Sequence, residues 1–219
     1  MNSALTALPV ETETAVESSA KREQIMDGAR KVFLEHGFDG ASMNDIVRAT
    51  GVSKGTIYAY FPSKERLFET LVFEDRRVQA ERLFDGIDAS RPAEEVLREM
   101  GYRFGRSLTQ PAHVAYIRMV MAASAKFPEA GRAFYEAGPR YGIAKLAEFI
   151  TEKVGQGELR ADDPEMAARQ FLELAHCGIG KRILFSAAER IDDAEVERTA
   201  TAAVKTFMAA YGIERGEPA

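Results

Sequence analysis

The 219-residue sequence contains one cysteine, Cys177, and no apolar run close to the roughly 18 residues that a membrane-spanning helix needs. A single cysteine cannot form a disulfide within one chain, so nothing requires an oxidising compartment, and we expect a reduced, mostly buried thiol. The start of the chain also lacks the basic segment of an export signal. We therefore expect a cytoplasmic protein that has no membrane partner.

Recognisable catalytic and metal-binding patterns are also absent from the sequence. His36, His113 and His176 lie far apart, and none has a partner at the spacing of metal ligands. His176 and Cys177 are neighbours on an expected helix, where adjacent residues face different directions, so joint metal binding or a nucleophile pair is disfavoured. Residues 178–181 resemble part of a phosphate-binding loop, but its first glycine and the residue after its lysine are replaced. We expect no cofactor, no metal and no enzymatic activity.

The chain has no general excess of positive charge, because its formal net charge is -5 and its pI is about 5.4. This balance excludes a protein that binds nucleic acid over its whole surface, since such binding depends on neutralising phosphates. Residues 21–64 differ from the remainder: seven basic and five acidic residues give this segment +2, and the rest of the chain carries -7. Any contact with DNA is therefore expected to be local to this segment.

Helical periodicity dominates the chain, and no strand pattern competes with it, so we predict an all-α fold. Residues 1–20 carry three glutamates without helical periodicity, which indicates a disordered acidic tail. After a first helix that starts near Lys21 and ends at Gly37, the expected helices are 43–50, 54–60, a segment from Lys64 past Phe73, 93–108, 112–126, 128–154, 164–185 and 194–211. Asp163 and Asp192 are expected to cap the last two of these helices.

The segment from Ala41 to Lys64 has the spacing of a helix-turn-helix. Ser42 and Asp45 match a capping box, Gly51 supplies the turn between the two short helices, and Ser53 can cap the second one. The second helix is then free to enter a major groove of DNA.

The outward residues of that second helix combine a cation, hydroxyl groups and a glycine within two turns. Such residues can hold a phosphate at the helix N-terminus and donate to the DNA backbone. The alternative is that the lysines are merely solvated and that Tyr58 packs between helices. The DNA-binding candidates, including two that flank this helix, are Ser42, Ser53, Lys54, Gly55, Thr56, Tyr58, Tyr60 and Lys64.

A stretch of about 45 residues resembles the signature of TetR-family regulators. The resemblance rests on Gly37-Phe38 and on the run from Thr56 through Phe61-Pro62-Ser63-Lys64 to Leu67. The resemblance implies a homodimer that binds double-stranded operator DNA. It places Ser42 near a phosphate, Lys54 to Tyr60 in the groove and Lys64 on the DNA backbone. Tyr60 stands where the family commonly has histidine, and Val47 and Thr50 replace frequent alanines.

The C-terminal part is similar to the AefR-like branch of that family. The similarity rests on Arg118, Phe127-Pro128-Glu129, Gly138-Pro139, Gly157-Glu158-Leu159 and Asp163-Pro164. It implies a helical domain that senses an unidentified small molecule. The predicted organisation is a disordered tail (1–20), a helix-turn-helix DNA-binding domain (21–66), a helical ligand-binding and dimerisation domain (67–213) and a flexible tail (214–219).

Apolar and aromatic side chains with a few polar groups are typical of ligand pockets in helical bundles, although most such residues simply form core. Arg118, if it turns inward, is the expected partner for an acidic ligand group. The candidate ligand residues are Tyr102, Tyr116, Arg118, Met119, Phe134, Tyr141 and Phe149.

The last two expected helices each offer an apolar stripe that could form a four-helix bundle between two subunits. We therefore predict a transcription regulator, a repressor by default, that a ligand releases from its operator. Two alternatives remain open: an all-helical enzyme that keeps a basic N-terminal hairpin, and an interaction module that does not bind DNA.

Overall fold

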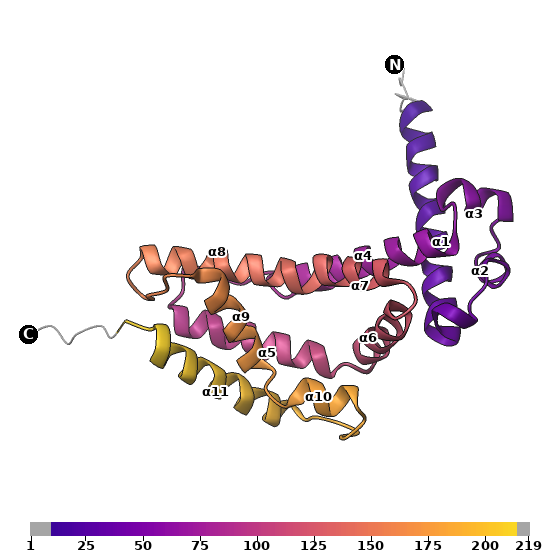
Figure 1. Cartoon of the computed structure of the whole chain (residues 1–219). Coiled ribbons are helices and arrows are strands. Elements are labelled where there is room, and N and C mark those ends of the chain that lie inside the picture. The colour runs from indigo at the N-terminus through magenta and orange to yellow at the C-terminus, as the bar shows by residue number, and fades with distance from the viewer. Residues whose placement is uncertain (1–9, 214–219) are drawn as a thin grey trace, which may run out of the picture. The chain divides into compact units, whose positions relative to one another are not determined.

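The computed structural model describes residues 10–213, and their regular elements are eleven α-helices and one π-helical turn (Figure 1). Their bounds are α1 (Val10–Gly40), α2 (Met43–Thr50), α3 (Lys54–Tyr60), α4 (Lys64–Arg82), α5 (Ala93–Thr109), α6 (Pro111–Ser124), α7 (Pro128–Tyr135), η1 (Glu136–Arg140), α8 (Tyr141–Gly155), α9 (Pro164–Ala175), α10 (Ile179–Leu184) and α11 (Asp193–Tyr211). The all-α prediction is confirmed. No helix within residues 10–213 is long and apolar enough to cross a membrane.

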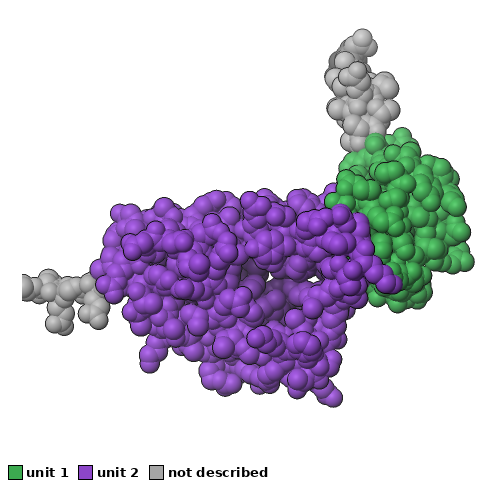
Figure 2. All heavy atoms as spheres, in the orientation of Figure 1, with its two compact units in different colours: residues 1–71 green, residues 72–219 purple. Residues whose placement is uncertain are grey.

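The chain divides into two compact units, residues 1–71 and residues 72–219 (Figure 2). We call them unit 1 and unit 2. The division falls inside α4, after Leu71, whereas the sequence suggested a boundary between residues 66 and 67. Helix α4 therefore contributes its first turns to unit 1 and its remaining turns to unit 2.

Helix α1 begins at Val10, so residues 10–20, expected to be disordered, are helical. A contact with α3 accounts for the difference: the Tyr60 hydroxyl donates to the Ser18 carbonyl oxygen at 3.2 Å and lies 3.1 Å from the Ser18 hydroxyl. Because this contact joins polar groups that are distant in sequence, it produces no periodic pattern of apolar residues from which the helix could be predicted. The helix is kinked at Gly37, which has φ 68° at the position where the sequence predicted the helix end. Residues 1–9 and 214–219 lie outside the described residues.

The core of unit 1 contains a cluster of three aromatic rings. Phe33, Phe38 and Phe68 are buried, and the rings of Phe33 and Phe38 lie 4.8 and 4.9 Å from the Phe68 ring, centroid to centroid. Helices α1 and α2 approach closely at Gly28, where a Cβ would lie 2.3 Å from Cγ2 of Thr50. Glycine at this position therefore sets the packing distance between the two helices.

The core of unit 2 is formed mainly by α5, α8, α9 and α11. The apolar stripe of α11, namely Val196, Ala200, Ala203, Val204 and Phe207, is buried. It packs within the protomer, against α5 and α9. The N-caps predicted for α9 and α11 are present, since Asp163 accepts from the Met166 N–H at 2.9 Å and Asp192 from the Glu195 N–H at 2.7 Å.

Two expected helices are interrupted. The segment 128–154 contains the π-helical turn η1, in which Pro139 has no N–H to donate and regular α-helical bonding is lost. The segment 164–185 breaks between α9 and α10, where Gly178 adopts a left-handed conformation with φ 74°. Cys177 lies in this break and is exposed, so the expectation of a buried thiol is wrong.

Candidate DNA-binding interface and ligand cavity

The N-terminus of α2 carries the predicted capping box. The Asp45 N–H donates to the Ser42 hydroxyl at 3.2 Å, and the Ser42 N–H donates to the Asp45 carboxylate at 3.0 Å. The hydrogen bond from the Ser42 hydroxyl holds the pKa of Asp45 below its usual value. The Ser42 side chain is therefore occupied at the helix start, where it remains exposed.

The turn between α2 and α3 is fixed by Thr50, which sequence reasoning treated only as a replaced alanine. Its hydroxyl donates to the Ile46 carbonyl at 2.8 Å and accepts from the Val52 N–H at 3.2 Å. Its own carbonyl accepts from the Gln24 side chain on α1 at 2.8 Å. Gly51 then ends α2 in a left-handed conformation with φ 65°. Together these bonds hold α2 and α3 at one angle.

Helix α3 presents its polar residues outward. Ser53 caps the helix by accepting from the Thr56 N–H at 3.1 Å, and the two hydroxyls lie 2.8 Å apart. Lys54 and Gly55 are exposed, and a Cβ at Gly55 would meet no atom within 4 Å. Tyr58 is 40% exposed. A positively charged, glycine-containing helix surface of this kind can approach a DNA backbone closely.

Two of the candidate DNA-binding residues use their polar atoms inside unit 1. The Tyr60 hydroxyl is bound to Ser18 on α1. The Lys64 ammonium donates to the carbonyl oxygens of Phe38 at 2.8 Å and Ala41 at 3.0 Å, and lies 4.4 Å from the centre of the Phe38 ring. Lys64 therefore holds the chain where α1 ends and α2 begins. Because an ammonium has three donors, one remains for a further partner.

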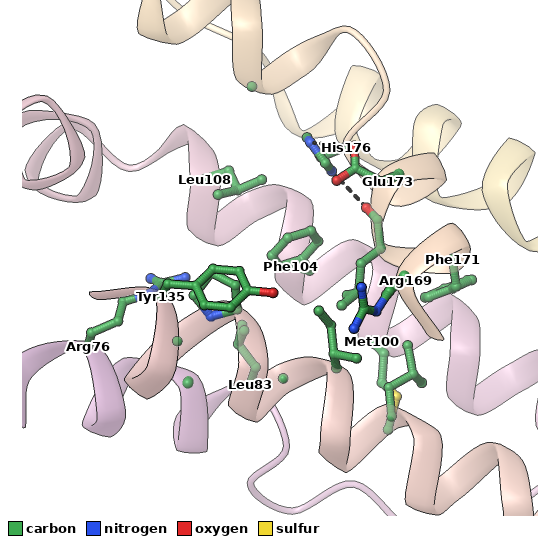
Figure 3. A pocket seen from close by; sticks show the side chains of 18 of the residues that line it. Arg76, Leu83, Met100, Phe104, Leu108, Tyr135, Arg169, Phe171, Glu173 and His176 are labelled. Carbon is green, nitrogen blue, oxygen red and sulfur yellow. Dashed lines mark hydrogen bonds and ion pairs between the residues drawn. The ribbon is translucent and has the colours of Figure 1, made fainter. Parts of the chain in front are cut away.

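Unit 2 contains a cavity of about 590 Å³ between α4 and α10, a volume within the range of small-molecule sites. Its walls are mainly apolar. Figure 3 shows Phe104 lying between Arg76 on one side and the polar residues Arg169, Glu173 and His176 on the other, and Met100 lines the same cavity. The cavity can therefore hold an apolar molecule that has a polar group.

Arg76 is the buried cation of this cavity, with only 6% of its surface exposed. Its Nη1 lies 3.3 Å from His113 Nε2 and 3.4 Å from the Gln79 oxygen, and its guanidinium carbon lies 4.9 Å from the Phe134 ring centre. The buried Nε has no hydrogen-bond partner. Burial lowers the pKa of Arg76 to about 10, so the group remains charged near neutral pH.

His113 is buried beside Arg76 and is neutral near pH 7. Burial, together with the positive charge of Arg76, lowers the pKa of His113 to about 4. Since Arg76 Nη1 can only donate, His113 Nε2 accepts, and Nδ1–H then donates to the Gln79 oxygen at 2.9 Å. The positive charge of Arg76 is thus solvated by neutral acceptors.

Of the seven ligand residues suggested from the sequence, Phe134 lines this cavity. Tyr116, Met119 and Phe149 are buried elsewhere in unit 2. Tyr102 packs against a buried apolar cluster that includes Val114 and Ile179. The centre of the Tyr141 ring lies 3.7 Å from the guanidinium carbon of Arg77. Of the aromatic candidates, Phe134 is therefore the one that we keep as a proposed ligand residue of this cavity.

Arg118 does not turn into the cavity. Its guanidinium donates to the carbonyl oxygens of Ile183 at 2.7 Å and Leu184 at 3.1 Å, and to the Ser186 hydroxyl at 2.8 Å. It therefore satisfies the carbonyls at the end of α10, where positive charge is favourable. The buried arginine of the cavity, Arg76, was missed. A signal for it existed, because it interrupts a stripe of apolar residues at helical spacing, formed by Val72 and Ala80 on α4 and by Leu83 directly after α4.

Separate helix-turn-helix and hollow helical units are the architecture of bacterial transcription regulators that bind DNA. Residues 25–71 match the family described as bacterial regulatory proteins, tetR family. Residues 95–213 match the AefR-like transcriptional repressor C-terminal domain. The chain belongs to the TetR family of DNA-binding transcription regulators.

Three similar proteins carry this assignment. The HTH-type transcriptional repressor AcnR of Corynebacterium diphtheriae is 38% identical over 93 residues, which cover 42% of this chain and 45% of the relative, so this match spans less than half of that protein. AcnR of Corynebacterium glutamicum is 28% identical over 76% of this chain and 84% of its own length. The solved structure of the flavonoid-responsive regulator FrrA is 33% identical, with a TM-score of 0.80, over 90% of this chain and 99% of that one.

Proposed function

We propose that this chain is a repressor that binds operator DNA as a homodimer and is released by a small molecule bound in the cavity of unit 2. DNA reading is assigned to residues 21–66, and ligand binding and dimerisation to residues 67–213. The observation that carries the proposal is the surface of α3: Lys54, Gly55 and Tyr58 are exposed, while Ile57 on the same helix is completely buried. Two such helices in a dimer would read successive major grooves roughly 34 to 36 Å apart.

Repression, rather than activation, is supported by the relatives and by the family of the C-terminal domain. Both AcnR proteins are named repressors, and residues 95–213 match a domain described from AefR-like repressors. For release, the effector has to bind the DNA-incompetent state more tightly than the competent one. A ratio of about 100 corresponds to roughly 2.7 kcal/mol of coupling.

The name of FrrA gives a starting point for the effector, since that protein is described as flavonoid-responsive. Flavonoids are flat, largely apolar molecules with several oxygen acceptors. The cavity of about 590 Å³ has mainly apolar walls and a buried donor, Arg76. The name therefore suggests flat, largely apolar molecules, a body that a carboxylic acid can share, as the first compounds to test for release of DNA.

The function is tested by fluorescence anisotropy on DNA from directly upstream of the gene that encodes the chain, with scrambled DNA at the same salt concentration. We expect saturable binding that survives competitor DNA. Lys54→Ala should weaken it and reduce the slope of log K against log salt by about one, because one phosphate contact is lost. Lys31→Ala is the matched control, since Lys31 is an exposed lysine that belongs to α1 and not to α3.

Equal, weak and salt-sensitive binding to both DNAs would show that this region is not the operator. A genome-wide selection that also returned no preferred sequence would overturn the regulator assignment in favour of an interaction module. An equal loss with Lys31→Ala and Lys54→Ala would remove α3 from its proposed role. Lys64 is unsuitable for this test because its ammonium is hydrogen-bonded inside unit 1.

A further inference from the structure

Arg76 is a buried charge without an acidic partner. Ion pairs in unit 2 join other arginines to carboxylates, for example Arg77 to Glu81 at 2.7 Å, but none between Arg76 and a carboxylate is found among residues 10–213. Burying a cation without an opposite charge is unfavourable for folding, so stability alone does not explain an arginine at this position.

The unused donors of Arg76 lie on one edge of the guanidinium. The hydrogen bonds to Gln79 and His113 both involve Nη1, while Nε is buried and has no partner. The Nε–Nη2 edge of an arginine presents two parallel N–H groups, which match the two oxygens of a carboxylate. Since Nε is itself buried, Nη2 is the donor left for a ligand, and the positive charge of the guanidinium favours an anionic carboxylate oxygen over the neutral oxygen of an alcohol.

Gly138 packs directly against Arg76. A Cβ at residue 138 would lie 2.2 Å from Nε of Arg76, so the absence of a side chain there lets the guanidinium lie along this wall. Gly138 belongs to the π-helical turn η1 and lines the same cavity as Arg76. Turns of this kind are frequent at functional sites. The unpartnered donor, the missing side chain and the irregular turn therefore occur together at one wall of the cavity.

We propose that the effector is an apolar carboxylic acid whose carboxylate pairs with the guanidinium of Arg76 through Nη2 while its apolar body lies against Phe104 and Met100. This inference rests on the proposed sensor function and names the chemical class of its ligand. His113 and Gln79 position the guanidinium through Nη1, and the polar residues on the other side of the cavity take no part in holding the carboxylate.

The test compares two molecules that share one body and differ in the head group: 1-pyrenebutyric acid and 1-pyrenebutanol. Binding to the full chain, without DNA, is measured by pyrene fluorescence anisotropy at pH 7.5, where the acid is ionised. We expect the acid to bind about 10- to 100-fold more tightly than the alcohol, the range for hydrogen bonds to a charged group. Dodecanoic acid and dodecanol, followed by calorimetry, repeat the comparison with a chain-shaped body.

Arg76→Met should abolish this preference for the acids without weakening binding of the alcohols. Arg77→Met is the matched control and should keep the preference, because Arg77 is next to Arg76 on α4, is paired with Glu81 and does not line the cavity. Arg76→Lys keeps the charge but loses the guanidinium that His113 and Gln79 position, and should fall between the two. In the ligand-free protein, Arg76→Met should melt at the same or a higher temperature than the native chain.

Equal binding of acid and alcohol by the native chain would overturn the proposal, as would failure of both acids to bind. A preference that survives Arg76→Met, or a marked fall in the melting temperature of that variant, would also count against it, since the arginine would then be structural. None of these measurements involves DNA. A failure of operator binding would therefore remove the proposed function separately from the ligand class.

Discussion

At the scale of single residues, the ammonium group of Lys64 serves the protein interior. It donates to two backbone carbonyls and lies over the ring of Phe38, one of the buried aromatic residues of unit 1. The phosphate contact implied by the resemblance would use its third donor. A lysine of this kind contributes to folding whether or not it touches DNA.

We therefore expect Lys64→Met to lower the free energy of unfolding by about 1 to 3 kcal/mol, because two carbonyls lose a charged donor. Lys54→Met, at an exposed position on α3, should change it by less than about 0.5 kcal/mol. Urea unfolding followed by circular dichroism measures both variants. Equal stabilities would show that the bonds made by Lys64 contribute nothing to folding.

For Gly55 we expect a substitution to affect DNA binding and to leave folding intact. A Cβ there has open space, so Gly55→Ala should leave the fold intact and stabilise α3 by up to about 1 kcal/mol through helix propensity. If DNA lies against this part of α3, the added methyl group should weaken operator binding, about tenfold for 1.4 kcal/mol. Thermal unfolding and DNA anisotropy on the same sample separate the two effects. Undiminished DNA binding would place the backbone of the DNA elsewhere.

His113 predicts how stability depends on pH. Its pKa of about 4 in the folded chain lies below the ordinary value of 6.5, so the unfolded chain binds a proton first as the pH falls. Stability is therefore lost between about pH 6.5 and pH 4, by roughly 2 kcal/mol at pH 5. Melting temperatures at pH 7, 6 and 5 should fall less for His113→Gln, which does not titrate. Parallel curves for the two proteins would contradict the assignment of a neutral, buried histidine.

At the scale of helices, local chemistry decided what the sequence could predict. Helices α2 and α3 were placed correctly because Ser42, Gly51 and Ser53 act within a few residues of themselves. The π-helical turn and the break at Gly178 were missed, because Pro139 and Gly178 are tolerated in several conformations and tertiary packing selects one. Local sequence therefore locates helix ends more reliably than interruptions within a helix.

The cavity shows the corresponding limit for the ligand site. The sequence suggested Tyr116, Met119 and Phe149 as ligand residues, with a place in the core as the alternative, and they are buried. The sequence does not indicate which inward faces lack an opposing side chain, since this depends on helices distant in sequence. Phe134 faces the cavity and Phe149 faces the core for this reason alone.

The contact between α1 and α2 predicts a rescue experiment. A Cβ at Gly28 would overlap Cγ2 of Thr50, and Thr50 cannot rotate without losing its bonds to Ile46 and Val52. Gly28→Ala should therefore destabilise the chain by about 1 to 3 kcal/mol, as overpacking does. Gly40→Ala, on the same helix with its nearest neighbour at 3.5 Å, is the control.

Adding Thr50→Ser to Gly28→Ala removes the overlapping methyl group and keeps the hydroxyl. We expect this pair of changes to recover most of the stability in urea unfolding. No recovery would mean that the loss has another cause than the contact between residues 28 and 50.

At the scale of the whole molecule, the proposed homodimer cannot use the apolar stripe of α11, because that stripe is buried within the protomer. The outward residues of α11 include the small side chains Ala202 and Ala209, and Phe185 at the end of α10 is 80% exposed. We therefore propose that α10 and the outward side of α11 form the interface. Small residues permit close helix packing, and an exposed phenylalanine can anchor it.

Phe185→Arg together with Ala202→Arg should convert the dimer into a folded monomer of 24.2 kDa, measured by light scattering after gel filtration. Met121→Arg is the control, since Met121 is an exposed apolar residue on α6 with 59% of its surface accessible. A native chain that is already monomeric at assay concentration, or a dimer that tolerates both arginines, would remove this interface.

The exposed Cys177 can be labelled with a spectroscopic probe. It is the only thiol in the chain and lies in the break between α9 and α10, directly after His176, which lines the cavity. A maleimide-linked nitroxide or dye thus attaches at one defined position per subunit without any engineered substitution. In a homodimer the distance between the two labels, one on each subunit, can then be measured with and without the effector.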